Sequence, residues 1–196
     1  MATLKYEEVY QKYVIDGLSD NDIANEFHVG KTAVVHCRKR NNIPTREYLG
    51  SIGEGIVMNE LQQSGFVAIN MNMRSKIHPY DILVHGLVRI DVKTATPCEG
   101  RWKFQLSNPA ITGNVESDHY VKLENGRMRK QFEKVCDFLI FCGINGNKHS
   151  LFVVPAAETT KNSQVISIGV LSGIKWQEWH NRFDLITNLI NARRKD

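Results

Sequence analysis

Three charged residues in two neighbouring apolar segments have the types and the spacing of a metal-assisted hydrolytic site. Asp81 lies in the segment 80–84, and Asp91 and Lys93 lie in the next one, 87–93. Side chains repeat every two positions along a strand, so residues 91 and 93 share one face. If the two segments are adjacent antiparallel strands, Asp81 and Asp91 meet at one end of a sheet. Neighbouring carboxylates repel each other unless a cation lies between them, and their oxygens suit Mg²⁺.

Such a site favours hydrolysis of a phosphodiester. A water molecule made more acidic by the metal is a suitable nucleophile, and Lys93 would orient it or stabilise the charge that grows on the phosphate. Asp91 and Lys93 interrupt an otherwise apolar segment, where a charge is costly unless it is paired or functional. The alternative is that the aspartates flank turns and that Lys93 is a solvated strand residue.

The elements that would hold these residues follow from the hydrophobic pattern. We expect a helix from Gly50 to about residue 63, a hairpin of 80–84 and 87–93 across His85-Gly86, and one amphipathic helix over 176–191. Residues 107–131 are polar and poorly periodic and are predicted to be a loop. The remaining predicted strands are 66–70, 101–106, 137–142, 151–154 and 165–171. This mixture of helices and strands predicts an α/β fold.

In this order the segments resemble the PD-(D/E)XK, or restriction endonuclease-like, nuclease superfamily. Asp81 takes the place of the first acidic residue of its motif, and Asp91 and Lys93 take the places of the (D/E)xK pair. The proline is displaced, because Tyr80 separates Pro79 from Asp81. The resemblance implies a mixed central sheet flanked by helices, a Mg²⁺-dependent endodeoxyribonuclease activity in which Mn²⁺ is expected to replace Mg²⁺, and a homodimer.

The resemblance also implies further metal ligands. The Val92 carbonyl would be one of them. Residues 50–54 are similar to the helix that precedes the core in archaeal Holliday-junction resolvases and related nucleases. A glutamate at the place of Glu54 often completes the metal site there, which makes Glu54 a predicted catalytic residue and metal ligand. Glu60, on the same predicted helix, is the alternative for that role.

The first 46 residues show a sharp reversal of charge. Residues 1–30 hold two lysines and six acidic residues, whereas residues 31–46 hold five basic residues and no acidic one. Apolar spacing predicts three short helices here, over 4–16, 20–27 and 31–40. A basic third helix in an otherwise acidic unit indicates a face presented to a polyanion.

Three short helices with a tight break before the third resemble helix-turn-helix DNA-binding domains, over roughly residues 4–46. Ala24, Val29 and Val34 stand at the small and apolar positions of that plan, while His28 occupies a place where many members have glycine. The resemblance implies that the third helix enters the major groove. Base-edge or sugar contacts are then expected from Lys31, Thr32 and His36, and phosphate contacts from Arg38, Lys39, Arg40 and Arg46. Arg74 and Lys76 are predicted to contact phosphates near the cleavage site.

The whole chain is consistent with two units. Its 196 residues have a near-average globular composition and a net charge of +4. We expect a helix-turn-helix domain over 1–46 and a nuclease domain over 50–196. No apolar run approaches the ~18–20 residues of a membrane span and no signal peptide is visible, so an intracellular, cytoplasmic protein is expected. The four cysteines form no CxxC pair, and Cys136 and Cys142 are expected in the core.

The leading hypothesis is a Mg²⁺-dependent DNA endonuclease whose first 46 residues bind duplex DNA, as in restriction, homing, phage or mobile-element nucleases. Two alternatives stay open. One is a resolvase of Holliday junctions or other branched DNA. The other is a non-catalytic DNA-binding regulator whose nuclease-like domain serves for dimerisation.

Overall fold

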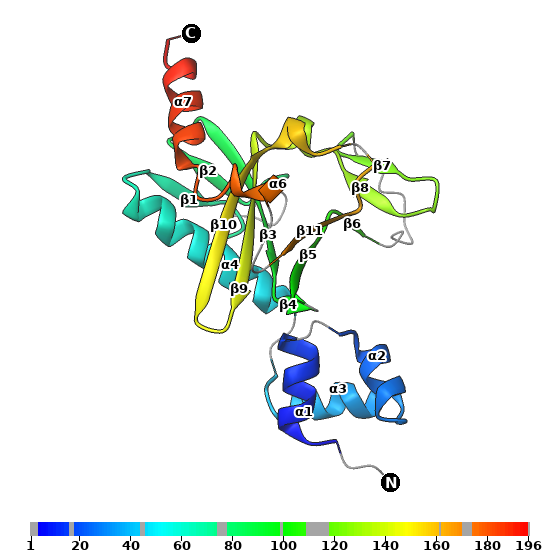
Figure 1. Ribbon diagram of the computed structural model, residues 1–196. Coiled ribbons are helices and arrows are strands. Elements are labelled where there is room, and N and C mark those ends of the chain that lie inside the picture. Colours follow the sequence, from blue (N-terminus) through cyan, green and yellow to red (C-terminus); the bar gives the residue numbers. More distant parts are fainter. Residues whose placement is uncertain are drawn as a thin grey trace.

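The architecture combines a small helical unit at the N-terminal end with a larger part built on a five-stranded sheet (Figure 1). The structure is a computed structural model and describes residues 4–15, 18–43, 46–73, 78–98, 100–108, 118–160, 162–169 and 174–195. Within these ranges, no helix is both long and apolar enough to cross a membrane.

The helical unit contains α1 (Tyr6–Tyr10), which continues as the π-helix η1 (Gln11–Ile15), then α2 (Asp20–Glu26) and α3 (Lys31–Arg40). Ser19 begins α2 with a capping box: its hydroxyl accepts the Asp22 N–H at 3.2 Å, and the Asp22 carboxylate accepts the Ser19 N–H at 3.1 Å. This reciprocal pairing satisfies backbone donors that a helix leaves open at its start. The sequence prediction of three short helices is therefore confirmed in this unit.

A separate small core holds these helices together. Its buried members are Val9, Ile23, Ala24, Val34 and Ile43, and Val29 packs against them. His28, between α2 and α3, has a φ of 54°, in the left-handed region that glycine adopts most easily. The turn thus has the backbone geometry that explains a preference for glycine, although histidine provides it here.

The central sheet has the strand order β1-β2-β3-β9-β10. Its strands are β1 (Ala68–Asn70), β2 (Ile82–Val84), β3 (Val88–Ala95), β9 (Phe138–Asn145) and β10 (Lys148–Pro155). Only the β3–β9 pair is parallel, so the sheet is mixed, as predicted. Residues 85–87 join β2 to β3 in a tight turn, in which His85 and Gly86 have φ values of 50° and 70° and the Leu87 N–H donates to the Val84 carbonyl at 2.9 Å.

Both faces of the central sheet are covered. The helices α4 (Arg46–Gln63) and α7 (Phe183–Arg193) contribute to the core on one face. The other face packs against a small sheet of β11 (Val165–Gly169), β5 (Arg101–Gln105) and β4 (Pro97–Cys98). Neighbouring residues of β9 therefore enter different cores, which explains its continuous apolar sequence. Cys142 of this strand and Cys136 are buried, as expected.

Two sequence predictions for the larger part are wrong. The segment predicted as a loop over 107–131 contains β6 (Ser107–Asn108), β7 (Tyr120–Lys122) and β8 (Met128–Lys130), which form a third sheet in the order β6-β8-β7. Strands this short and polar carry no clear alternation signal.

The predicted helix over 176–191 is instead α6 (Ile174–Gln177) followed by α7, with a break in which Asn181 has a φ of 53°. A non-glycine residue in this left-handed region cannot continue a helix.

In addition, α4 begins at Arg46 rather than at Gly50, so the backbone of Arg46 belongs to this helix. The short helices α5 (Phe132–Val135) and η2 (Ala156–Glu158) complete the fold.

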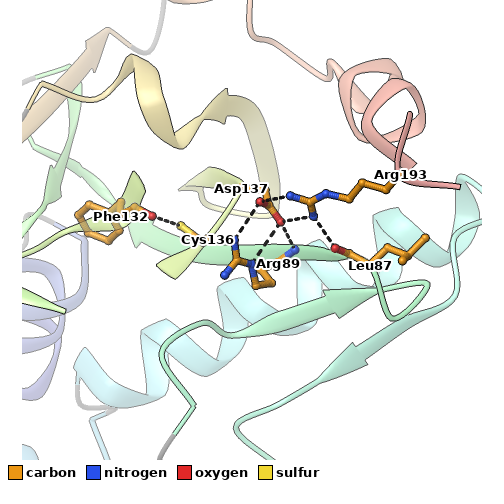
Figure 2. A network of polar contacts seen from close by, with 6 residues as sticks. All are labelled: Leu87, Arg89, Phe132, Cys136, Asp137 and Arg193. Carbon is orange, nitrogen blue, oxygen red and sulfur yellow. Dashed lines mark hydrogen bonds and ion pairs between the residues drawn. The ribbon is translucent and has the colours of Figure 1, made fainter. Parts of the chain in front are cut away.

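A half-buried aspartate, Asp137, connects α7 to the sheet (Figure 2). Arg193 donates two hydrogen bonds to the Asp137 carboxylate, at 2.7 and 2.9 Å, and one to the Leu87 carbonyl at 2.5 Å. The Arg89 backbone N–H donates to the same carboxylate at 2.8 Å. Burial alone would raise the pKa of Asp137, but hydrogen bonds from Arg193 and Arg89 outweigh it, and the net pKa is lowered. The network joins the starts of β3 and β9 to the end of α7.

Candidate active site

The aspartates predicted from sequence meet where β2 and β3 pair. In the register of these strands Ile82 lies opposite Ile90, and Asp81 and Asp91 are the next residues beyond that pair. The Asp81 N–H donates to the Ile90 carbonyl at 2.9 Å, and its carboxylate accepts the Val92 N–H at 2.7 Å. Asp81 is therefore fixed to the strand that carries the other two residues of the predicted site.

The charges of the two aspartates act on each other. Burial is the largest cause that raises the pKa of Asp81, and the negative charge of Asp91 raises it further. Lys93, the Val92 N–H and Asn72 act in the opposite direction but do not cancel the increase. The charge of Asp91 therefore disfavours the ionised form of Asp81.

Asp91 is 1% exposed and has an ammonium group on each carboxylate oxygen. Lys93 pairs with Oδ1, as expected for two residues on one face of a strand, and Lys130 pairs with Oδ2. Burial would raise the pKa of Asp91, but the two lysines outweigh it and lower the net value. Burial would likewise lower the pKa of Lys93, yet Asp91 and Asp81 raise it overall. Asp91 and Lys93 thus each favour the charged form of the other.

Lys130 is a site residue that the sequence prediction missed. It lies in β8, within the segment predicted as a loop, and nothing in its spacing connects it to Asp91. The Phe132 ring lies behind both lysines, with its centroid 5.2 Å from the Lys93 Nζ and 5.8 Å from the Lys130 Nζ. Both distances allow a cation–π attraction. Phe132 thus gives the two ammonium groups a common apolar wall.

Glu54 reaches the cluster through two asparagines that were not predicted either. Asn72 donates from its amide both to Glu54 Oε1 and to Asp81 Oδ1, each at 3.0 Å. Asn70 donates to Glu54 Oε2 at 3.0 Å, and its own Oδ1 accepts the Asn72 N–H at 2.9 Å. Glu60, the alternative on the same helix, instead lies 3.1 Å from the Nε2 of His149. Of the two glutamates, the structure connects Glu54 to the aspartates.

A glycine sets the distance between α4 and β3. A Cβ atom on Gly53 would lie 1.8 Å from Thr94 Oγ1 and 2.8 Å from Thr94 Cβ, so the helix approaches the strand closely only because residue 53 has no side chain. Thr94 Oγ1 is buried without a hydrogen-bond partner in the part of the chain that is described. Because Glu54 follows Gly53, this contact also fixes where Glu54 stands.

The chemistry of the cluster fits a hard divalent cation. Asp81 and Asp91 offer carboxylate oxygens, and the charge of Asp91 raises the pKa of Asp81, an effect that a shared cation would relieve. No three Asp, Glu, His or Cys side chains among the described residues group as a metal site. Two carboxylates are sufficient for Mg²⁺, however, since this ion keeps several of its waters. The Val92 carbonyl is a further oxygen at the same place in the chain.

Most of the residues predicted to contact DNA lie on the surface of α3. The predicted contacts that are exposed on this helix are Lys31, Thr32, His36, Lys39 and Arg40. Since these side chains share one helix and include three basic residues, the charge reversal seen in the sequence corresponds to an accessible basic helix. The side chain of Arg46, and Arg74 and Lys76 altogether, lie outside the described residues.

Arg38 has a structural role in place of the predicted phosphate contact. It is 8% exposed, its Nε and Nη2 donate to the two carboxylate oxygens of Asp20 at 2.7 Å each, and its guanidinium carbon lies 4.0 Å from the centroid of the Tyr13 ring. A side chain engaged in this way joins α3 to α2. We therefore do not retain Arg38 among the proposed DNA contacts. Sequence alone could not separate it from its basic neighbours.

Comparison with known proteins establishes the fold. The chain matches no protein-family model and no curated protein sequence. Its structure is similar to that of a bacterial homing endonuclease, I-Ssp6803I, with a TM-score of 0.57 and 12% sequence identity, over 78% of this chain and 99% of that one. The predicted α/β class, with a mixed central sheet flanked by helices, is confirmed. At this identity the similarity is one of architecture.

Proposed function

We propose that this protein is a metal-dependent endodeoxyribonuclease of the PD-(D/E)XK type. The observation that carries the proposal is the largely buried cluster of Asp81, Asp91 and Lys93 at the β2–β3 junction. A buried group of charges at a strand pair is costly to maintain, and a hydrolytic site gives it a use. The fold shared with a homing endonuclease supports the same reading.

The residues would divide the chemistry among themselves. Asp81, Asp91 and the Val92 carbonyl would hold Mg²⁺, which supplies an acidified water and neutralises phosphate charge when it is bound. Lys93 would orient the attacking water or stabilise the phosphate oxygens. Glu54 would supply a further oxygen for the metal, directly or through a water molecule. Asn72 would position it, because its amide donates to both Glu54 and Asp81.

We further propose that the helical unit is a helix-turn-helix that binds duplex DNA. Lys31, Thr32 and His36 would meet base edges or sugars, and Lys39 and Arg40 would meet phosphates, which position the protein without specifying sequence. Arg46, Arg74 and Lys76 remain predicted phosphate contacts. Homodimer formation would allow both strands of a duplex to be cut.

The decisive experiment is a digest of supercoiled plasmid and of four-way-junction DNA with Mg²⁺. We expect the wild type to cut, and Asp91→Asn and Lys93→Met to be slower by about a hundredfold or more, the usual effect of losing a group that stabilises the transition state. Exposed Asp184→Asn and Lys148→Met serve as charge-matched controls and should cut normally. Mapped ends on the two substrates separate a duplex endonuclease from a resolvase of branched DNA.

One observation favours a non-catalytic alternative. Both oxygens of Asp91 already bind ammonium groups, so the charge of this aspartate is compensated without a metal. A DNA-binding regulator with a nuclease-like dimerisation domain would need no more than that. Tight duplex binding by the wild type, together with no cleavage under any divalent metal, would establish this reading and exclude the enzyme.

A further inference from the structure

Lys130 has no role in the proposed function, although its side chain connects the third sheet to the aspartate cluster. Its side chain is 16% exposed, and its ammonium group pairs with Asp91 Oδ2. β8, which carries it, pairs only with β6 and β7 among the described strands, so the contact with Asp91 is made across sheets rather than within one.

The neighbouring residue anchors β8 in this position. Arg129 is fully buried, and its guanidinium donates to the carbonyls of Ser163 and Lys130 at 3.0 Å each and to Thr159 Oγ1 at 3.4 Å. Because side chains alternate along a strand, an inward Arg129 directs Lys130 to the opposite face. The placement of Lys130 on Asp91 thus follows from a fixed strand and is not a chance surface contact.

Any cation that binds Asp91 must compete with a lysine, because each of its two oxygens already holds one. The two lysines are not equivalent. Lys93 lies two residues from Asp91 on β3 and is influenced by both aspartates, whereas Lys130 arrives from another sheet on a long and flexible stem. Lys130 is therefore the partner that can leave without disturbing the central sheet.

We propose that Lys130 compensates Asp91 as a substitute cation and that, when metal and DNA bind, it moves from Asp91 to an oxygen of the DNA phosphate at the site. This inference rests on the proposed function. An ammonium group displaced within a largely buried site needs another anion, and the phosphate is the one that such a reaction brings there. Lys130 would thus be a substrate-binding residue outside the family motif.

The first test measures metal binding without DNA, by titrating the full-length protein with Mn²⁺ in a calorimeter. Removal of a competing charged partner by Lys130→Met should tighten Mn²⁺ binding by about tenfold, since a charge-assisted hydrogen bond no longer has to be broken. Lys122→Met, an exposed lysine on the neighbouring strand β7, is the matched control and should leave Mn²⁺ affinity unchanged.

The second test measures duplex binding with Ca²⁺ in place of Mg²⁺, so that binding is followed without cleavage. Lys130→Met should weaken duplex binding by about tenfold, through loss of one buried phosphate contact. Lys130→Arg, which keeps the charge and pairs with a carboxylate more firmly, should retain duplex affinity and weaken Mn²⁺ binding. This second variant keeps the test informative if the methionine variant folds poorly.

The outcomes distinguish a wrong role for Lys130 from a wrong assignment of the nuclease function. If wild type binds Mn²⁺ and Asp91→Asn abolishes that binding, but Lys130→Met does not tighten it, the substitution role of Lys130 is wrong. Unchanged duplex affinity of Lys130→Met would refute the phosphate contact. If wild type binds no Mn²⁺, or Asp91→Asn binds it equally well, the metal site itself is absent and the proposed function fails first.

Discussion

The contact of α4 with β3 allows a sharp prediction, because two glycines in one helix should respond to alanine in opposite ways. Gly53 faces Thr94, where a new Cβ would lie 1.8 Å from Oγ1 and 2.8 Å from Cβ. Gly55 is in the same helix, and a new Cβ there meets nothing within 4 Å. The two substitutions add the same methyl group and differ only in what surrounds it.

The magnitudes follow from two competing effects. Replacing glycine by alanine inside a helix stabilises it by about 1 kcal/mol, and Gly55→Ala should gain most of this. Gly53→Ala gains the same amount but overpacks the interface, which costs about 1–3 kcal/mol. Since both clash distances are below any real Cβ contact, we expect the upper end of that range. The net effect is a loss of about 2 kcal/mol.

Thermal unfolding measures the difference directly. A change of 1 kcal/mol shifts the Tm of a chain of this length by about 2–4 °C, so the two variants should move to opposite sides of the wild type. In the Gly53→Ala background, Thr94→Ala should recover part of the loss, because it removes the nearest of the clashing atoms. Equal stabilisation by Gly53→Ala and Gly55→Ala would refute the close packing and, with it, the position assigned to Glu54.

Three further outcomes are expected. Arg193→Met should destabilise the protein by about 1–2 kcal/mol at pH 7, measured by denaturant unfolding, since its contact with Asp137 is partly exposed. Because the folded pKa of Asp137 is lowered, this contribution is complete above the ordinary aspartate pKa of about 4 and disappears as the pH falls through the folded value, so wild type and variant should converge in acid. Ser19→Ala should cost about 1 kcal/mol of protection in the amide hydrogen exchange of α2, through loss of its cap. Arg38→Gln should loosen the helical unit, whereas Lys39→Gln should lower the salt dependence of duplex binding by about one phosphate contact; identical behaviour of the two variants would contradict their different surroundings.

The parts of the fold that sequence predicted are those with strong local patterns. The continuous apolar run of β9 indicated a strand, and the apolar segments around His85-Gly86 indicated the β2–β3 hairpin. Alternation within one strand then placed Lys93 beside Asp91. Each of these inferences depended on residues close together in the chain, where spacing determines geometry.

The parts that sequence did not predict depend on distant contacts. Lys130 contacts Asp91 because the buried Arg129 fixes β8. A strand of three residues is too short to show a periodicity from which this contact could be predicted. Asn72 joins Glu54 to Asp81 from a turn, where its residue type is ordinary. Arg38 has the composition of its basic neighbours and differs from them only by the position of Asp20. Tertiary pairing decides each case.

The ion pairs of Asp91 with Lys93 and Lys130 connect the stability of the protein to its proposed chemistry. Burying the charge of Asp91 would cost too much free energy if the charge were unpaired. One of its oxygens pairs with Lys93 of the central sheet and the other with Lys130 of the third sheet. The third sheet therefore stabilises the central one through Asp91, in addition to its own anchor at Arg129. If Lys130 leaves Asp91 for a phosphate, the electrostatic link between these sheets is replaced by one that passes through the metal and the DNA. Arg129 would keep β8 in place during this exchange, so only the Lys130 side chain would respond to the bound substrate.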